Sequence, residues 1–183
     1  MAVQIILCVE TSKKADTDSA YILEAIRYYY EIDRQVRLSI VYMNTKSKYK
    51  AKDVVRGIEQ KINMFTIGES KVIYCIDTDL FETNYEHKCE LEKIQAFCES
   101  RSYGLIWFCH DVEEVFLGKS VSDSRKVKEA IVFKRQRLIE KLDAGRLQSS
   151  QKTAHTSNML CILDKYLKRK KDVFQAGGES DED

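Results

Sequence analysis

The chain has 183 residues and a formal net charge of +1, and this length suits one domain with a sizeable core. A nearly neutral chain has no global field that would attract nucleic acid or a membrane, so any such binding must come from a local patch. The six cysteines show no CxxC pair and no zinc-ligand spacing. With neither a signal peptide nor a long apolar segment, the sequence predicts a soluble, reduced, cytoplasmic protein without membrane contact.

Apolar runs of strand type alternate with segments of helical periodicity. Strands are predicted at 3–10, 36–43, 71–77 and 103–111, with helices at 15–32, 53–65 and 86–100 and Asp53 as an N-cap. Such alternation, with continuous apolar strands, indicates a parallel sheet that is covered on both faces. C-terminal helices are predicted at 123–142 and 157–170. One domain is therefore expected over 1–172, followed by a disordered acidic tail at 173–183.

The third predicted strand runs directly into two carboxylates, Asp77 and Asp79. Side chains two positions apart on a strand point the same way, so these two acids should share a face or converge at the end of the strand. Two like charges at that spacing repel unless a cation lies between them or one of them takes a proton. The first possibility is a metal site.

Acids also close the first and fourth predicted strands. Glu10 ends the first strand, and Asp111 follows the fourth, with Glu113 and Glu114 directly after it. Parallel strands end at a common edge, where ligands of open α/β sheets bind. One or two Mg²⁺ or Mn²⁺ ions there would orient and polarise a phosphate and activate a water molecule. The alternative is that these acids are turn residues or N-caps; Asp111 would cap a helix that begins at Val112.

A lysine-rich segment, "NTKSKYKAKD", follows the second predicted strand. Lys46, Lys48 and Lys50 could meet a phosphate backbone, and Tyr49 could stack on a base. The alternative interpretation is a solvated loop without a ligand.

Three short motifs carry a resemblance to a known family. They are an acid that closes the first strand ("LCVE"), D-x-D closing the third ("YCIDTD"), and an acid in an apolar helix start after the fourth ("HDVEEVFLG"). The chain resembles the TOPRIM superfamily, and within it the RloB-like proteins, over about residues 3–168, with Glu113 as the matching acid of the last motif. The first turn, "ETSKKADTD", lacks the glycine usual in the family and reaches its next acids only at Asp16 and Asp18.

The resemblance implies a three-layer α/β/α fold of Rossmann type, with a four-stranded parallel sheet in the order 2-1-3-4 and C-terminal helices. This order would bring Glu10 beside Asp77 and Asp79. Members of the superfamily are nucleotidyl transferases, strand-cleaving enzymes or Mg²⁺-dependent nucleases. RloB-like proteins often accompany an ATPase in bacterial defence against phage, so the expected partners are nucleic acid and an ATPase.

The leading hypothesis is a metal-dependent phosphodiesterase that acts on DNA or RNA. Glu10 would be a general base or a metal ligand, Asp77 and Asp79 would hold the ion, and Glu113 would complete the site. A second hypothesis is a non-catalytic TOPRIM-like subunit that serves as a sensor or an inhibitor of a larger partner. A receiver-like signalling domain ranks third, because its first strand should end in an acid pair. The oligomeric state stays open.

Overall fold

The computed structural model describes residues 2–14 and 16–171, and the tail that was expected to be disordered lies outside this range. The described elements follow the expected alternation of strands and helices. In chain order they are β1 (Ala2–Val9), α1 (Asp18–Tyr29), β2 (Val36–Tyr42), η1 (Lys46–Lys48), α2 (Lys52–Asn63), β3 (Gly68–Asp77), α3 (Tyr85–Ser100), β4 (Gly104–Phe108), α4 (Val112–Leu117), α5 (Asp123–Arg135), η2 (Leu138–Lys141), η3 (Ala144–Gln148) and α6 (Met159–Leu163).

The four strands form one parallel sheet in the order β2-β1-β3-β4. β1 and β3 are neighbours, and their register pairs Val9 with Cys75. β3 and β4 are paired as far as Asp77 and Phe108. The carboxyl ends of β1, β3 and β4 therefore lie side by side, and the residues that follow each strand emerge at the same edge of the sheet.

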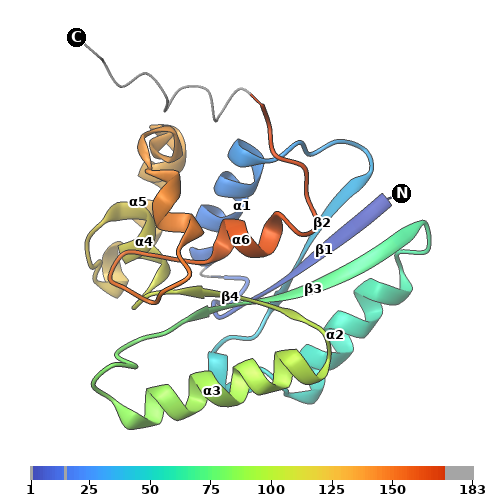
Figure 1. Ribbon diagram of the computed structural model, residues 1–183, viewed down its shortest axis with the longest axis horizontal. Coiled ribbons are helices and arrows are strands. Elements are labelled where there is room, and N and C mark those ends of the chain that lie inside the picture. The colour runs from blue at the N-terminus through green and yellow to red at the C-terminus, as the bar shows by residue number, and fades with distance from the viewer. Residues whose placement is uncertain (1, 15, 172–183) are drawn as a thin grey trace.

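Both faces of the sheet are buried, which explains the continuous apolar strands. In β1, Ile5, Leu7 and Val9 contact the core on the side of α1, α4, α5 and α6. The intervening Ile6 and Cys8 contact the core on the side of α2 and α3. Figure 1 shows the resulting three layers, with α2 and α3 below the sheet and the other helices above it. The α/β/α class is confirmed.

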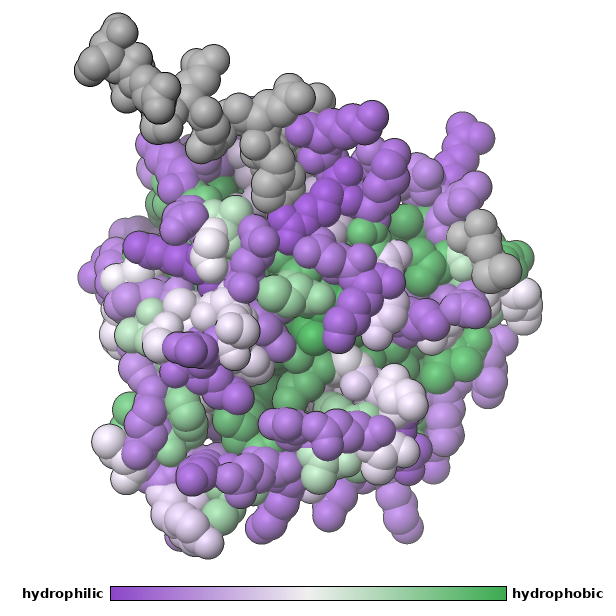
Figure 2. All heavy atoms as spheres, viewed as in Figure 1, coloured by the Kyte–Doolittle hydropathy of each residue, from purple (hydrophilic) through white to green (hydrophobic). Residues whose placement is uncertain are grey.

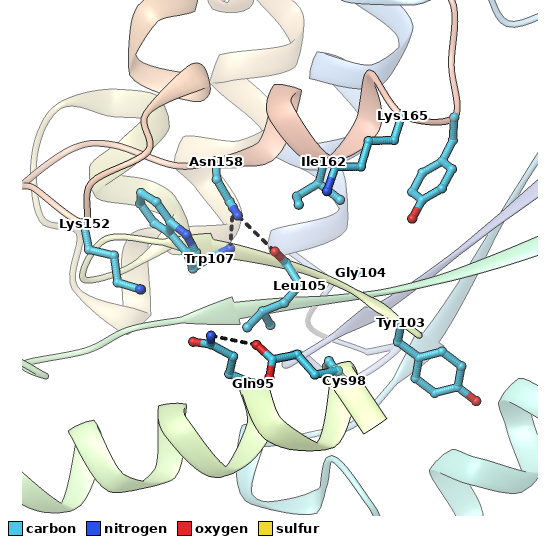
Figure 3. A pocket seen from close by; sticks show the side chains of 12 residues that line it. Gln95, Cys98, Tyr103, Gly104, Leu105, Trp107, Lys152, Asn158, Ile162 and Lys165 are labelled. Atoms are coloured by element: carbon cyan, nitrogen blue, oxygen red, sulfur yellow. Dashed lines mark hydrogen bonds between the residues drawn. The ribbon is translucent and has the colours of Figure 1, made fainter. Parts of the chain in front are cut away.

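The edge of the sheet at β4 is covered in part by an asparagine side chain. Asn158 Oδ1 accepts a 2.9 Å hydrogen bond from the backbone N–H of Trp107, and its Nδ2 donates a 3.0 Å bond to the carbonyl of Leu105 (Figure 3). The amide thus satisfies strand groups that would otherwise be open to pairing with another chain.

Figure 2 shows hydrophobic side chains in a band across the middle of this view, with hydrophilic ones over most of the rest.

Three details of the helices differ from the expectation. Asp53 lies in the first turn of α2 and is not its N-cap, which is Ala51. The helix expected at 123–142 ends at Arg135, because Arg137 adopts a left-handed conformation with φ of 50° before a short 3-10 turn. The helix expected at 157–170 is only α6, Met159–Leu163, and it begins after Asn158, whose side chain is engaged with β4.

Candidate functional site

Glu10 and Asp77, which follow β1 and end β3, meet at the carboxyl edge of the sheet. The backbone N–H of Asp77 donates a 2.7 Å hydrogen bond to Oε1 of Glu10. Oδ1 of Asp77 is buried and has no hydrogen-bond partner among the described residues. Burial raises the pKa of Glu10 to about 8, against the opposing influence of Lys46. Burial, and then the charge of Glu10, also raise the pKa of Asp77. Lys46 therefore offsets only part of the effect of burial on this pair.

Asp18, in the first turn of α1, brings a third carboxylate to this place. Its residue is only 5% exposed, and burial followed by the charge of Glu113 raises its pKa to about 7. Sequence reasoning noted Asp18 only as the acid at the end of a long first turn. Its position could have been anticipated, because α1 follows β1 and must begin near the carboxyl end of that strand before it runs back along the sheet.

These three acids line one pocket of about 400 Å³ at the edge of the sheet. Its walls come from the turn after β1, the start of α1, the end of β3 and the first turns of α5. Lys126 of α5 also lines this pocket, and its ammonium group is paired with the buried Glu113. Nothing in the sequence singled out Lys126, because the contact of α5 with this edge is set only by the packing of the helices.

Glu113 lies behind this pocket and does not line it. Its side chain is fully buried, and Lys126 Nζ lies 3.0 Å from its Oε2. Burial raises the pKa of Glu113, and the nearby ammonium opposes this shift. Asp111 caps α4 through a 2.7 Å bond from the N–H of Glu114, as the alternative interpretation of the strand-end acids predicted. The ion pair of Glu113 with Lys126 thus holds the lysine side chain in position.

Asp79 does not join Asp77 in the pocket. β3 ends at Asp77, and Asp79 has a positive φ of 48°, so the alternation of strand side chains does not extend to it. The Asp79 carboxylate forms an ion pair with Lys46, and its side chain remains 43% exposed. Lys46 Nζ also donates a 3.0 Å hydrogen bond to the carbonyl of Asp77. The two acids of the D-x-D motif thus have different partners.

The lysine-rich segment divides into buried and exposed residues. Lys46 is 7% exposed and turned toward the acids, while Lys48 and Lys50 face solvent. Tyr49 is buried in the core, where its ring packs edge-on against Phe97 with 5.2 Å between centroids. The prediction that Tyr49 stacks on a base is therefore wrong, because its ring is packed inside the hydrophobic core.

A second group of side chains could hold a metal ion. Glu82, Cys109 and His110 each offer one ligand atom, and these atoms all lie within 4.8 Å of one another. Sequence reasoning missed this group, since the cysteines were judged by spacing along the chain and Glu82 lies 27 residues before Cys109. The only local signal was the adjacency of Cys109 and His110.

Comparison of the chain with models of protein families, with curated proteins and with solved structures found no match. None of the helices in the described part of the chain combines the length and apolar character needed to cross a bilayer.

Proposed function

We propose that the protein is a Mg²⁺- or Mn²⁺-dependent nuclease that hydrolyses phosphodiester bonds in DNA or RNA at the Glu10–Asp77 site. The observation that carries this proposal is Oδ1 of Asp77, a buried carboxylate oxygen without a hydrogen-bond partner among the described residues, beside a second buried carboxylate. Burying such a group without a partner is unfavourable. Carboxylate oxygens are the donors that hard divalent cations take, so the donor chemistry of these residues suits this cofactor.

Glu10, Asp77 and Asp18 would hold the ion. Asp79 could become a further ligand only if its ion pair with Lys46 were broken. A divalent ion bound there would supply positive charge for a phosphate and lower the pKa of a water molecule. Glu10 would be either a ligand of the ion or the group that accepts a proton from the attacking water. Lys126, which lines the pocket, would have to leave Glu113 to pair with a non-bridging phosphate oxygen.

The substrate would reach the pocket along exposed lysines. Lys48 and Lys50 follow β2 next to the pocket residues Asn44 and Thr45. Lys13, in the turn after Glu10, is also exposed. Such charges bind phosphates without regard to sequence. The resemblance to RloB-like proteins supports the further proposal that the enzyme works with an ATPase in defence against phage.

A specific observation favours a second candidate function, a non-catalytic subunit. Lys46 is paired with Asp79, and Lys126 with Glu113. Two acids of this edge are therefore already neutralised by side chains of the chain itself. In a sensor or inhibitor, these pairs would stabilise the fold, and the pocket would bind a cation or a phosphate group without turnover.

The substitution Glu10→Gln separates the two functions. It keeps the shape of the side chain and an oxygen that accepts the Asp77 N–H, but removes the charge. In an enzyme, hydrolysis should fall by at least about 100-fold with little change in nucleic-acid binding, because the lost interaction acts on the transition state. Glu92→Gln, an exposed carboxylate on α3, is the matched control. Hydrolysis that is equal in wild type and Glu10→Gln, or absent from both with DNA and RNA and either ion, would refute the catalytic proposal.

A further inference from the structure

The second group of possible ligands combines three different donor types from two segments. Glu82 belongs to the turn after β3, and Cys109 and His110 directly follow β4. Oε1 of Glu82 lies 3.9 Å from Sγ of Cys109 and 3.4 Å from Nε2 of His110. None of these three residues lines the pocket of Glu10 and Asp77, so the group is a separate feature of the same sheet edge.

The two donor separations that involve Glu82 are close to those of a tetrahedral zinc site, and all three donor atoms lie within 4.8 Å of one another. With zinc–ligand bonds of about 2.1 Å to nitrogen and oxygen and about 2.3 Å to sulfur, tetrahedral angles separate nitrogen from oxygen by about 3.4 Å and sulfur from oxygen by about 3.6 Å. The corresponding distances from Glu82 are 3.4 Å to His110 and 3.9 Å to Cys109. A shift of a few tenths of an ångström in the exposed Glu82 side chain would close the difference.

The orientation of His110 is set by a second carboxylate. Its Nδ1 lies 2.9 Å from Oε2 of Glu114, which belongs to the first turn of α4. A proton on Nδ1 that is donated to this carboxylate leaves Nε2, which faces Glu82, with a free lone pair. Metal-binding histidines commonly have such an outer carboxylate, which fixes the tautomer and the plane of the ring.

The backbone at Cys109 and His110 is held by hydrogen bonds from two neighbouring segments. The N–H of Cys109 donates a 2.9 Å bond to the carbonyl of Thr156, and the N–H of His110 donates a 2.9 Å bond to Oγ1 of Thr78. Donor atoms on a rigid backbone need little reorganisation to bind an ion. The sulfur of Cys109 is buried, whereas the side chains of Glu82 and His110 are 41% and 28% exposed.

We propose that Glu82, Cys109 and His110 bind one Zn²⁺ ion, with Glu114 as the positioning residue of His110 and water in the fourth position. A thiolate and an imidazole favour zinc over the hard ions that suit the carboxylate pocket. The exposed fractions of Glu82 and His110 leave the fourth position open on the solvent side. Cys109 would lose its proton to solvent on binding.

This ion would connect the turn after β3 to the end of β4. The linked segments are already joined by a 3.0 Å bond from the N–H of Asp79 to the carbonyl of His110. Zinc would therefore hold in place the segment that carries Asp77 and Asp79. The proposal does not rest on the nuclease function, because it requires only that the three donors bind the ion.

Titration of the metal-free full chain with Co²⁺ tests the site directly. A tetrahedral complex with one thiolate should give visible d–d bands and a near-ultraviolet sulfur-to-cobalt charge-transfer band at one equivalent, and Zn²⁺ should abolish both. Cys109→Ser should lose the charge-transfer band, whereas Cys161→Ser, a change at an exposed cysteine, should keep it. If Cys109→Ser does not fold, Glu82→Gln at its exposed position still decides, by weakening Zn²⁺ binding at least tenfold.

Two further variants separate this site from the acid pocket. Glu114→Ala should weaken Zn²⁺ binding about 10- to 100-fold, as loss of an outer carboxylate does, while the charge-transfer band remains at saturation. Glu10→Gln should leave Zn²⁺ affinity unchanged even if it abolishes hydrolysis. A cobalt spectrum without the charge-transfer band, or one that persists in Cys109→Ser or disappears in Cys161→Ser, would overturn the zinc proposal and leave the nuclease proposal untouched.

Discussion

The backbone N–H of Asp77 donates a 2.7 Å hydrogen bond to Oε1 of Glu10 across the two central strands. This bond joins residues 67 positions apart in the chain and holds two carboxylates at one end of a parallel sheet. It satisfies one oxygen of Glu10, but Oδ1 of Asp77 stays buried without a hydrogen-bond partner among the described residues. Because burial raises the pKa of both carboxylic acids, the site favours either a bound proton or a bound cation.

Divalent ions should stabilise the folded protein, because an ion that binds only the native state shifts the unfolding equilibrium by mass action. At 100 times the dissociation constant, Mg²⁺ or Mn²⁺ should add about 2.7 kcal/mol to the free energy of unfolding. Asp77→Asn should remove this gain and should itself stabilise the metal-free protein by relieving repulsion with Glu10. Thermal denaturation across a millimolar range of each ion measures both effects. A melting temperature independent of ion concentration in the wild type would contradict the site.

The metal-free protein should lose stability as the pH rises from 5 to 8.5. Glu10 and Asp18 have folded-state pKa values raised by burial to about 8 and about 7, above the ordinary values of an unfolded chain. The stability that these two groups contribute is fully present below their unfolded-state pKa values. It is lost as the pH rises through their folded-state pKa values. We therefore expect the free energy of unfolding to fall steadily across this pH range, as measured by urea denaturation in chelator at several pH values.

The substitution Glu10→Gln provides the control for this pH dependence. His110 has a pKa raised by its hydrogen bond to Glu114, so it contributes a loss in the same direction. Because Gln does not titrate, the difference between the wild-type and Glu10→Gln curves isolates Glu10. Parallel curves would show that Glu10 does not change protonation in this range.

The exposed lysines after β2 should contribute to nucleic-acid binding without sequence preference. Lys48→Ala with Lys50→Ala should weaken binding and reduce the salt slope of the binding constant by about 2, one for each lost phosphate contact. Lys88→Ala with Lys93→Ala removes the same charge from exposed positions of α3 and is the matched control. Equal salt slopes for the two double variants would show that the segment after β2 is only a solvated turn.

The pair of Lys126 and Glu113 should stabilise the fold only when both partners are present. Lys126→Met leaves Glu113, a fully buried carboxylate, without its cation, and should cost about 1–3 kcal/mol of unfolding free energy. Adding Glu113→Leu should recover most of that loss, since a buried ion pair can often be replaced by apolar side chains. Denaturant unfolding of the two single variants and the double variant measures the coupling. Additive effects would mean that the two residues do not interact.

The sequence by itself determined the strands, the class of sheet and the edge where acids collect. β1 and β3 read as apolar runs because both of their faces are buried, and parallel strands necessarily end together. The positions of Glu10 and Asp77 at adjacent strand ends follow from these local patterns once the strand order is known. The N-cap role of Asp111 was likewise a local property of the residue that precedes α4.

Only the tertiary structure decided which side chains meet at that edge. Asp18 and Lys126 enter the pocket because α1 and α5 pack on the same face of the sheet, and no periodicity reports such packing. Tyr49 is taken into the core, although its neighbours in the sequence are exposed lysines. Glu82 reaches Cys109 through the pairing of β3 with β4. A pattern along the chain specifies which way a side chain points within its own element, whereas contacts between distant residues depend on how the elements pack together.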